Sequence, residues 1–159
     1  MILHSAIIES PLGTLKIEGD DNGISAVCKS ENEIVSAAIP KELENAVLQL
    51  TDYFLGKRKT FNLKLNPKGT VFQQKVWAEL QKIPFGKTTS YLDLAKKLGD
   101  PKVIRAAAAA NGKNPILILI PCHRVIGSDG SLTGFSAGLW RKKWLLEHEN
   151  PNHQKELFD

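Results

Sequence analysis

The feature that most constrains the fold is a run of five apolar residues, Ile116 to Ile120, enclosed between Pro115 and Pro121. The run is short and rich in β-branched residues, which favours a buried strand over a helix. Proline cannot donate a hydrogen bond to a strand ladder, so the strand should end at Pro121. Cys122 therefore lies where a predicted strand gives way to a turn.

Cys122 is followed directly by His123 and Arg124, so its thiol is expected to lie in electropositive surroundings. Such surroundings favour the thiolate, which is the nucleophilic form of cysteine. The first hypothesis is therefore covalent chemistry at Cys122. A simpler alternative stays open at this point, because a cysteine beside a strand is often just a small buried apolar residue.

The composition is that of a globular protein that folds without cross-links. The chain has 159 residues, 42% of them hydrophobic and 24% charged, which fits one domain or two small ones. No apolar run has membrane-spanning length, and the N-terminus lacks the basic start of a secretory signal. The two cysteines, Cys28 and Cys122, have no metal-binding spacing. We therefore expect a cytoplasmic protein with no membrane association, no disulfide, no metal and no cofactor.

Charge is distributed unevenly along the chain. Residues 1–65 carry 7 basic and 9 acidic side chains, a balance of −2, whereas residues 66–159 carry 14 and 8, a balance of +6. A basic C-terminal part beside a faintly acidic N-terminal part indicates a polyanionic partner for the C-terminal part alone. A solvated surface with no partner would give the same balance. The charge therefore indicates a polyanionic partner only if the basic residues share a face with a recognition element.

The N-terminal third predicts a small scaffold domain. Three segments alternate like strands and are separated by turn sequences: 2–9, 13–19 and 23–29. A helix is expected from Pro40 to about Gly56, and residues 61–65 alternate like a further strand. Asn66-Pro67-Lys68-Gly69 then marks a boundary. We expect an α/β (α+β) protein with a sheet-plus-helix domain over 1–66, a mostly helical domain over 67–150 and a tail over 151–159.

The C-terminal part predicts a helix-turn-helix. Thr70 and Gln73 form a capping box that begins one helix, and Ser90 caps a second, short helix that ends at Gly99. A third helix is expected from about Val103 to Asn111. Two short helices joined by such a turn form either a DNA-binding motif or a purely structural hairpin, and this pattern alone does not separate the two.

Five consecutive alanines, Ala106 to Ala110, make the last of these helices unusually thin. A helix with ordinary side chains is about 10–12 Å across, whereas the minor groove of DNA is about 6 Å wide. A helix stripped of bulk can approach a narrow groove, with Arg105 at its start reaching into the base stack. Close packing against another helix would also favour alanine.

These residues together resemble the alkylguanine-DNA alkyltransferases, also called methylated-DNA–protein-cysteine methyltransferases. The resemblance covers roughly residues 70–149. The N-terminal third of the chain resembles the family only in its general outline of strands and a helix. It is carried by the following strings: Thr88-Thr89-Ser90-Tyr91, Leu98-Gly99-Asp100-Pro101, Arg105 with its alanines, Asn114-Pro115, Ile118 through Val125, Gly134-Phe135-Ser136 and Leu145-Leu146-Glu147-His148-Glu149.

The resemblance implies direct-reversal DNA repair in a single turnover. Cys122 would take the alkyl group from 6-O-alkylguanine, with 4-O-alkylthymine as an open second substrate. His123 would act as base through a water molecule, and Glu149 would orient its imidazole. Tyr91 would donate a proton to the departing guanine, and Asn114 would fix the turn before the site. The partner would be double-stranded DNA carrying alkylated guanine, and the protein a monomer that needs no cofactor.

The resemblance also implies how DNA and the base are held. The damaged nucleotide would be rotated out of the duplex, with Arg105 filling the gap. Further DNA contacts would come from the helix surface and from basic residues that could equally be support or surface charge: Ala106, Ala109, Lys102, Lys113 and Arg124. The base pocket would be formed by the following residues: Val125, Phe135, Ser136 and Ala137. Position 137 departs from the glycine common in the family, which would narrow the range of alkyl groups. The alternatives are a binding-only damage sensor and a helix-turn-helix regulator.

Overall fold

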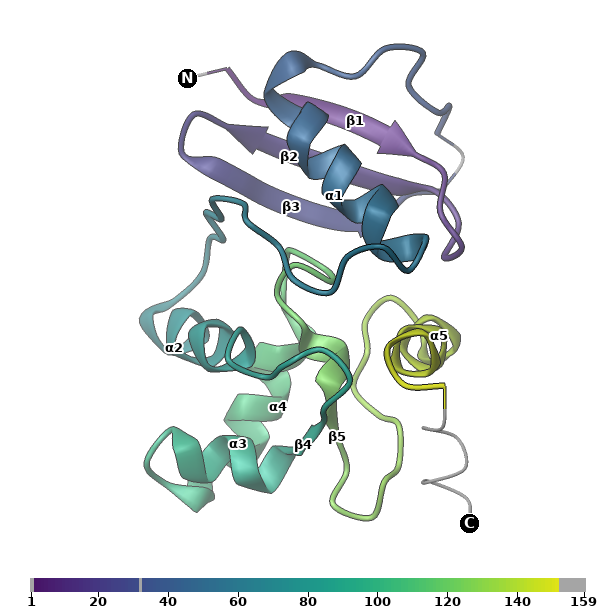
Figure 1. Ribbon diagram of the computed structural model, residues 1–159. Helices are drawn as coiled ribbons and strands as arrows, with labels where there is room; N and C mark the ends of the chain where they lie inside the picture. Colours follow the sequence, from purple (N-terminus) through teal and green to yellow (C-terminus); the bar gives the residue numbers. More distant parts are fainter. Residues whose placement is uncertain (1, 32, 152–159) are drawn as a thin grey trace. The chain divides into compact units, whose positions relative to one another are not determined.

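A computed structural model describes residues 2–31 and 33–151 (Figure 1). The chain divides into two compact units. The first contains Met1–Lys68 and Pro115–Leu119, and the second contains Gly69–Asn114 and Ile120–Asp159. The first unit combines an antiparallel sheet with a helix and the second is mostly helical, so the predicted mixed α/β fold class is confirmed.

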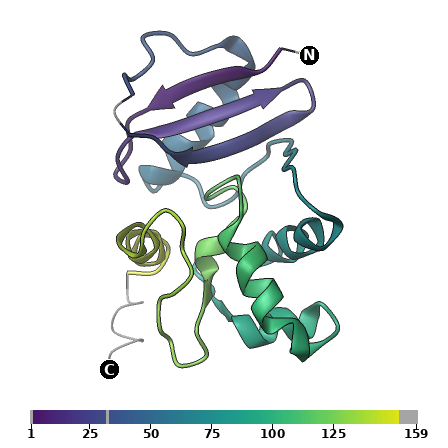
Figure 2. The ribbon, with the colours of Figure 1, turned by 180° about the vertical axis from the view of Figure 1, so that it is seen from behind.

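The first unit is built on a three-stranded antiparallel sheet in the order β1-β2-β3. The strands are β1 (His4–Ile8), β2 (Leu15–Asp20) and β3 (Gly23–Lys29). Alternate residues of β2 are buried, as expected for a sheet with one face covered. Helix α1 (Glu44–Phe54) covers that sheet, as the two opposite views show (Figures 1 and 2), and buries Leu50 and Tyr53 completely.

The strand predicted over residues 61–65 is wrong. Only Leu65 pairs with the sheet, as an isolated parallel bridge to Ile24. The backbone N–H of Ile24 donates to the carbonyl of Lys64 at 2.9 Å, and the N–H of Asn66 donates to the carbonyl of Ile24 at 2.7 Å. Alternation of apolar residues indicated one-sided burial, but a regular ladder also needs several successive backbone pairs, and here there is one.

The strand predicted over Ile116 to Ile120 is also wrong, although all five side chains are buried. Ile116 forms one bridge to Val27, after which the chain turns sharply at Ile118, where φ is 72°. The N–H of Leu119 donates to the carbonyl of Leu117 at 2.8 Å across this turn. A β-branched residue at positive φ is strained. Close packing of the apolar run therefore overrides its preference for an extended backbone.

The described part of the second unit contains four α-helices, two 3-10 turns and a minimal parallel sheet. The helices are α2 (Val71–Leu80), α3 (Tyr91–Lys97), α4 (Ile104–Gly112) and α5 (Leu139–Glu149). Strands β4 (Thr89–Ser90) and β5 (Val125–Ile126) pair in parallel. Short 3-10 turns cover Pro101–Val103 and Cys122–Arg124.

The helix starts follow the sequence closely. Thr70 and Gln73 form the predicted capping box, with Gln73 N–H to Thr70 Oγ1 at 3.1 Å and Thr70 N–H to Gln73 Oε1 at 2.9 Å. Ser90 caps α3 by accepting the N–H of Asp93 at 3.0 Å. Helices α3 and α4 form the predicted helix-turn-helix, and Trp77 Nε1 on α2 donates to the carbonyl of Ala110 on α4 at 2.9 Å. Among the described residues no helix is both long and apolar enough to cross a membrane.

Candidate active site

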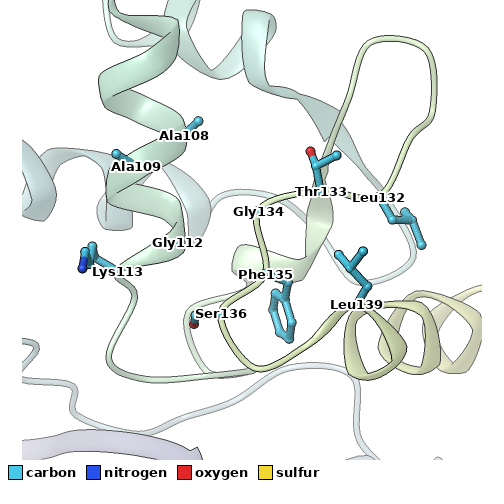
Figure 3. Close-up of a pocket in the computed structure, with 10 residues that line it drawn as sticks. All are labelled: Ala108, Ala109, Gly112, Lys113, Leu132, Thr133, Gly134, Phe135, Ser136 and Leu139. Carbon is cyan, nitrogen blue, oxygen red and sulfur yellow. The ribbon is translucent and has the colours of Figure 1, made fainter.

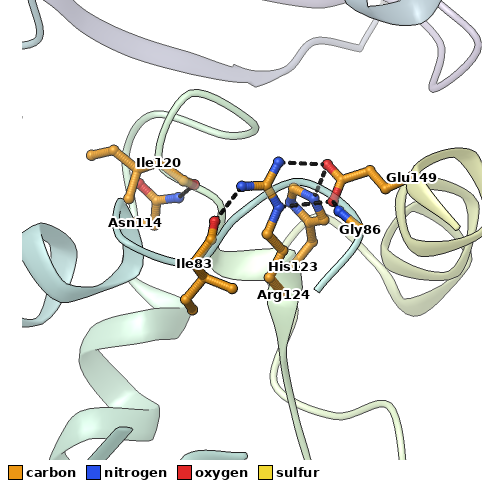
Figure 4. Close-up of polar contacts among 7 residues, drawn as sticks. All are labelled: Ile83, Gly86, Asn114, Ile120, His123, Arg124 and Glu149. Atoms are coloured by element: carbon orange, nitrogen blue, oxygen red, sulfur yellow. Dashed lines mark hydrogen bonds and ion pairs between the residues drawn. The ribbon is translucent and has the colours of Figure 1, made fainter. Parts of the chain in front are cut away.

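Cys122 is presented by a tight turn. Pro121 has φ −81° and ψ 63°, and the N–H of Cys122 donates to the carbonyl of Ile120 at 2.8 Å, which is an inverse γ-turn. The same carbonyl accepts a hydrogen bond from Asn114 Nδ2 at 2.7 Å (Figure 4). Asn114 is buried, so its amide fixes the backbone immediately before the thiol, which is the supporting place that its sequence position suggested.

The thiol itself is buried, and this changes its expected chemistry. Cys122 is 3% exposed, and burial raises the pKa of its thiol to about 11. A hydrogen bond from Asn114 and the charge of Lys142 lower this pKa, but by less than burial raises it. The expectation that electropositive surroundings hold Cys122 as a thiolate is therefore wrong for the resting protein. The group is a protonated thiol and has to lose its proton before it can act.

His123 and Glu149 form a buried pair. His123 Nε2 lies 2.7 Å from Glu149 Oε2, and the two side chains are 0% and 1% exposed (Figure 4). Burial lowers the pKa of His123, so the imidazole is neutral. Burial opposes ionisation of Glu149, yet His123 and Arg124 together hold the pKa of its carboxyl well below the usual range.

The charge states of this pair determine the histidine tautomer. A carboxylate can only accept, so Nε2 of the neutral imidazole carries the proton and donates it to Glu149. Nδ1 is then an unprotonated nitrogen with a lone pair. It is fully buried and has no hydrogen-bond partner among the described residues. The ring is thus held with one basic nitrogen available, next in sequence to the thiol.

Arg124 completes this pair rather than facing outward. Its Nε donates to Glu149 Oε1 at 2.8 Å and its Nη2 donates to Glu149 Oε2 at 2.9 Å, while Nη1 donates to the carbonyl of Ile83 at 2.6 Å. The N–H of Gly86 also reaches Glu149 Oε1 at 3.4 Å. Both carboxylate oxygens are therefore held by several donors, and a bidentate arginine fixes the plane of the carboxylate.

Tyr91 and Lys142 form a second buried group. The Tyr91 hydroxyl donates to the carbonyl of Thr133 at 2.8 Å. Lys142 Nζ donates to the carbonyls of Val125 at 2.6 Å and Thr133 at 2.7 Å, and to the Tyr91 hydroxyl at 3.4 Å. Burial lowers the pKa of Lys142 to about 8 and raises the pKa of Tyr91. A cationic amine thus lies beside the phenol, close enough for its charge to act on Cys122.

A mostly apolar pocket of about 670 Å³ opens between α4 and the loop that leads into α5 (Figure 3). Its size is within the usual range for small-molecule sites. Its lining consists of the following residues: Ala108, Ala109, Gly112, Lys113, Leu132, Thr133, Gly134, Phe135, Ser136 and Leu139. Thr133 belongs both to this lining and, through its carbonyl, to the group around Tyr91, so the pocket and that group share a wall.

The outer face of α4 is bare and basic at its edges. Arg105, Ala106 and Ala109 are exposed, whereas Ala107 and Ala110 are buried. Lys102 and Lys113, on either side of the helix, are also exposed. The sequence left two explanations for the alanines open, close helix packing and a thin surface for a groove. Both fit the structure, because one side of α4 packs against the core and the other presents a thin surface to solvent.

Comparison with known proteins agrees with this geometry. Residues 71–151 match the family model described as "6-O-methylguanine DNA methyltransferase, DNA binding domain", and residues 3–67 match the model of its ribonuclease-like domain. The chain belongs to the 6-O-methylguanine DNA methyltransferase family. A methylated-DNA–protein-cysteine methyltransferase of Methanosarcina acetivorans is 43% identical over 153 residues, which cover 92% of this chain and 98% of the relative. The constitutive enzyme of Bacillus subtilis is 41% identical, covering 93% and 96%.

Solved structures of the methyltransferase family are similar as well. Mycobacterium tuberculosis OGT in complex with DNA has a TM-score of 0.84 and 41% identity, covering 98% of this chain and 99% of that one. The M. tuberculosis O6-methylguanine methyltransferase has a TM-score of 0.85 and 40% identity, covering 94% of each chain. The similarity therefore extends over both compact units.

Three of the residues predicted to contact DNA or the base are buried in positions that indicate a supporting role instead. Arg124 is 6% exposed and bound to Glu149, so its predicted phosphate contact is wrong and its alternative, supporting place is the one observed. Val125 and Ala137 are buried, and neither is part of the pocket lining. The Val125 carbonyl accepts a hydrogen bond from Lys142, and the Ala137 carbonyl accepts one from Arg141. The backbone at both positions therefore supports the site. Phe135 and Ser136 do line the pocket.

Two residues of the methyltransferase site were missed from the sequence. Lys142 is fully buried, and Asn111 Nδ2 donates to the carbonyl of Cys122 at 3.3 Å. Lys142 could have been found by its helical spacing, because it shares a stripe with Leu145, Leu146 and Glu149. A charged residue inside an apolar stripe requires buried partners. Asn111 gave a weaker signal, as a polar residue at the end of an alanine helix.

Proposed function

We propose that this protein repairs 6-O-alkylguanine in duplex DNA by transferring the alkyl group to Sγ of its own Cys122. The observation that carries this proposal is the buried Arg124–Glu149–His123 chain, which ends at one unpaired ring nitrogen beside a cysteine. Nucleophile, base and orienting carboxylate follow one another as in other covalent catalytic sites. The pocket and the bare face of α4 are consistent with an everted base and a DNA groove. Relatives named methylated-DNA–protein-cysteine methyltransferase support the assignment.

The transfer is a single in-line displacement. The proton of the Cys122 thiol passes to Nδ1 of His123, through a bridging water, and the resulting imidazolium is stabilised by Glu149. The thiolate sulfur forms a bond to the alkyl carbon while the bond between that carbon and the guanine oxygen breaks. The electron pair goes to the guanine ring, which takes up a proton from Tyr91, and the phenol regains its proton from His123. Thiol and alkylguanine thus become thioether and guanine.

The raised pKa of Cys122 gives this sequence of events a reason. Ionising the buried Cys122 thiol is unfavourable while no substrate is bound. When the alkylated guanine is in place, the thiolate is consumed by the transfer as it forms. The thioether product has no leaving group comparable to guanine, so each molecule acts once. Lys142 stabilises the developing negative charge near Tyr91 and Cys122. All of these side chains belong to one compact unit, and we propose that a single copy of the protein is sufficient.

DNA is engaged through α4 in this proposal. The alkylated carbon is inaccessible inside a duplex, so the nucleotide is rotated out at a cost of a few kcal/mol. The thin face formed by Ala106 and Ala109 enters the minor groove, and Arg105 occupies the place that the base leaves. Lys102 and Lys113 contact phosphates, so binding weakens as salt concentration rises.

Mass spectrometry tests the proposed function directly. After incubation with a duplex containing 6-O-methylguanine, the intact protein is expected to gain one methyl group, located on the peptide that contains Cys122. Cys122→Ala is expected to gain none while still binding the duplex. Binding by the wild-type protein without any mass gain would instead identify a damage sensor, and repeated turnover would identify a hydrolase.

Arg105→Ala is expected to slow repair of duplex DNA by about tenfold or more, because the vacated stack is left unfilled and base eversion becomes less favourable. Reaction with a free 6-O-alkylguanine base should change far less, since no eversion is required. Single-turnover rates on the two substrates measure this difference. Lys57→Ala, which removes an exposed charge of the first unit, is the matched control. Equal losses on duplex and free base would contradict the role of Arg105.

A further inference from the structure

Asn111 is a buried polar residue on the inner side of α4. It is 1% exposed, and the other buried residues of the helix are the alanines Ala107 and Ala110. Asparagine is less favourable than alanine inside a helix, and a buried amide needs hydrogen bonds to offset its lost hydration. An asparagine at this position therefore requires a local reason, which alanine packing does not supply.

The amide of Asn111 reaches two groups of the proposed site. Its Nδ2 donates to the backbone carbonyl of Cys122 at 3.3 Å. The amide also acts on the Tyr91 phenol, whose pKa it lowers against the larger effect of burial. Its sequence neighbour Gly112 lines the pocket, and so does Thr133, whose carbonyl binds Tyr91. The amide thus holds the backbone of Cys122 and acts on the phenol, one residue away from the pocket lining.

The acceptor half of the same amide is unused. Asn111 Oδ1 is fully buried and has no hydrogen-bond partner among the described residues. Within the described part of the site, the other buried atom without a partner is His123 Nδ1, which the proposed transfer already uses. A buried acceptor without a partner is destabilising, and such groups in native proteins call for an explanation.

The chemistry of the substrate supplies a matching donor. Alkylation at oxygen 6 removes the proton from N1 of guanine, so the exocyclic 2-amino group is the one N–H donor left on the base in a nucleotide. That group and oxygen 6 lie on the same edge of the ring, separated by N1. A base whose oxygen 6 faces Sγ of Cys122 therefore directs its 2-amino group toward acceptors beside that residue.

We propose that Asn111 is a specificity-determining residue that recognises the 2-amino group of the everted guanine through Oδ1. The inference rests on the proposed function and assigns a part of the base to a particular side chain. It explains why the residue at this position both donates toward the nucleophile and keeps an acceptor free.

The test compares two duplexes that differ only in the 2-amino group. One contains 6-O-methylguanine and the other contains 6-O-methylhypoxanthine in the same sequence. Single-turnover rates of methyl transfer to Cys122 are measured for the wild-type protein, Asn111→Leu and Asn111→Ala. The wild-type protein is expected to prefer 6-O-methylguanine by about tenfold, the effect of one buried hydrogen bond. Both variants are expected to bring this ratio close to one, mainly by slowing reaction with 6-O-methylguanine.

The matched control is Asn114→Ala. Asn114 is also a buried asparagine whose amide donates to a backbone carbonyl next to the site, so its loss should slow both substrates by the same factor. Equal slowing of both substrates by the Asn111 variants would overturn the inference and leave Asn111 a purely structural residue. If the wild-type protein transferred a methyl group from neither duplex, the proposed function itself would fail. If Asn111→Leu does not give a folded protein by its thermal transition, Asn111→Ala supplies the same comparison with no added bulk.

Discussion

Replacing Glu149 with glutamine is expected to slow methyl transfer to Cys122 by about 100-fold or more. General base catalysis contributes about 10²–10⁴-fold, and in the proposed mechanism the base, His123, depends on its carboxylate partner. Without the negative charge the imidazolium formed from His123 is no longer stabilised. The amide also presents a donor where the carboxylate accepted from both His123 and Arg124. Single-turnover transfer from 6-O-methylguanine DNA measures the loss.

The same variant should also be markedly less stable. Arg124 is left as a buried cation without its counter-ion, and breaking such a pair costs about 3–5 kcal/mol. Because the pKa of Glu149 is lowered in the folded protein, its stabilisation is complete above the ordinary glutamate pKa of about 4.3 and is lost as pH falls below that value. Chemical denaturation at pH ~7 and pH ~5 should therefore give the same wild-type advantage. Glu147→Gln, two residues earlier, is the control, and equal effects of both changes would contradict the role of Glu149.

Replacing Lys142 with methionine is expected to slow transfer by about tenfold or more and to make the Cys122 thiol harder to ionise. The Lys142 charge lowers the pKa of Cys122, so its removal should raise that pKa above its value of about 11. The carbonyls of Val125 and Thr133 would also lose a buried donor. The rate of thiol alkylation by iodoacetamide, followed as pH rises, should increase at higher pH in the variant than in the wild-type protein.

Lys143→Met is the matched control for this prediction. Lys143 is the next residue of α5 and is exposed, so the change removes the same charge without disturbing buried carbonyls. It is expected to leave both the transfer rate and the pH dependence of thiol alkylation unchanged. An unchanged pH dependence in Lys142→Met would show that the amine supports only the backbone around Tyr91.

The parts of the fold that local chemistry determines could be predicted from the sequence. The capping box at Thr70, the cap at Ser90 and the alternation in β2 each depend on residues a few positions apart. The same holds for the helix-turn-helix, whose turn and second helix are set by Asp100, Pro101 and the alanines that follow. The resemblance to a known family then supplied the partners that are distant in sequence, such as Glu149 for His123.

The remaining features depend on packing that a linear pattern does not contain. Ile116 to Ile120 has the composition of a strand, yet burial can be satisfied by a bent backbone, and the turn at Ile118 follows from its neighbours in space. Arg124 resembles a surface charge until Glu149 is placed beside it. The protonation state of Cys122 was misjudged for the same reason, because desolvation depends on how many atoms surround the sulfur and outweighs the nearby positive charge.

The assignment of Pro115–Leu119 to the first compact unit has a practical consequence for the choice of expression fragments. This segment lies between Asn114 and Ile120 in the chain, yet the Pro115 carbonyl and the Leu117 N–H both bond to the backbone of Val27. A truncated protein that starts at Gly69 would retain Cys122 but leave four buried apolar residues, Ile116 to Leu119, without the strand that pairs with this segment. Such a fragment should be prone to aggregate, and deleting the first third of the chain is therefore a poor route to a minimal alkyltransferase.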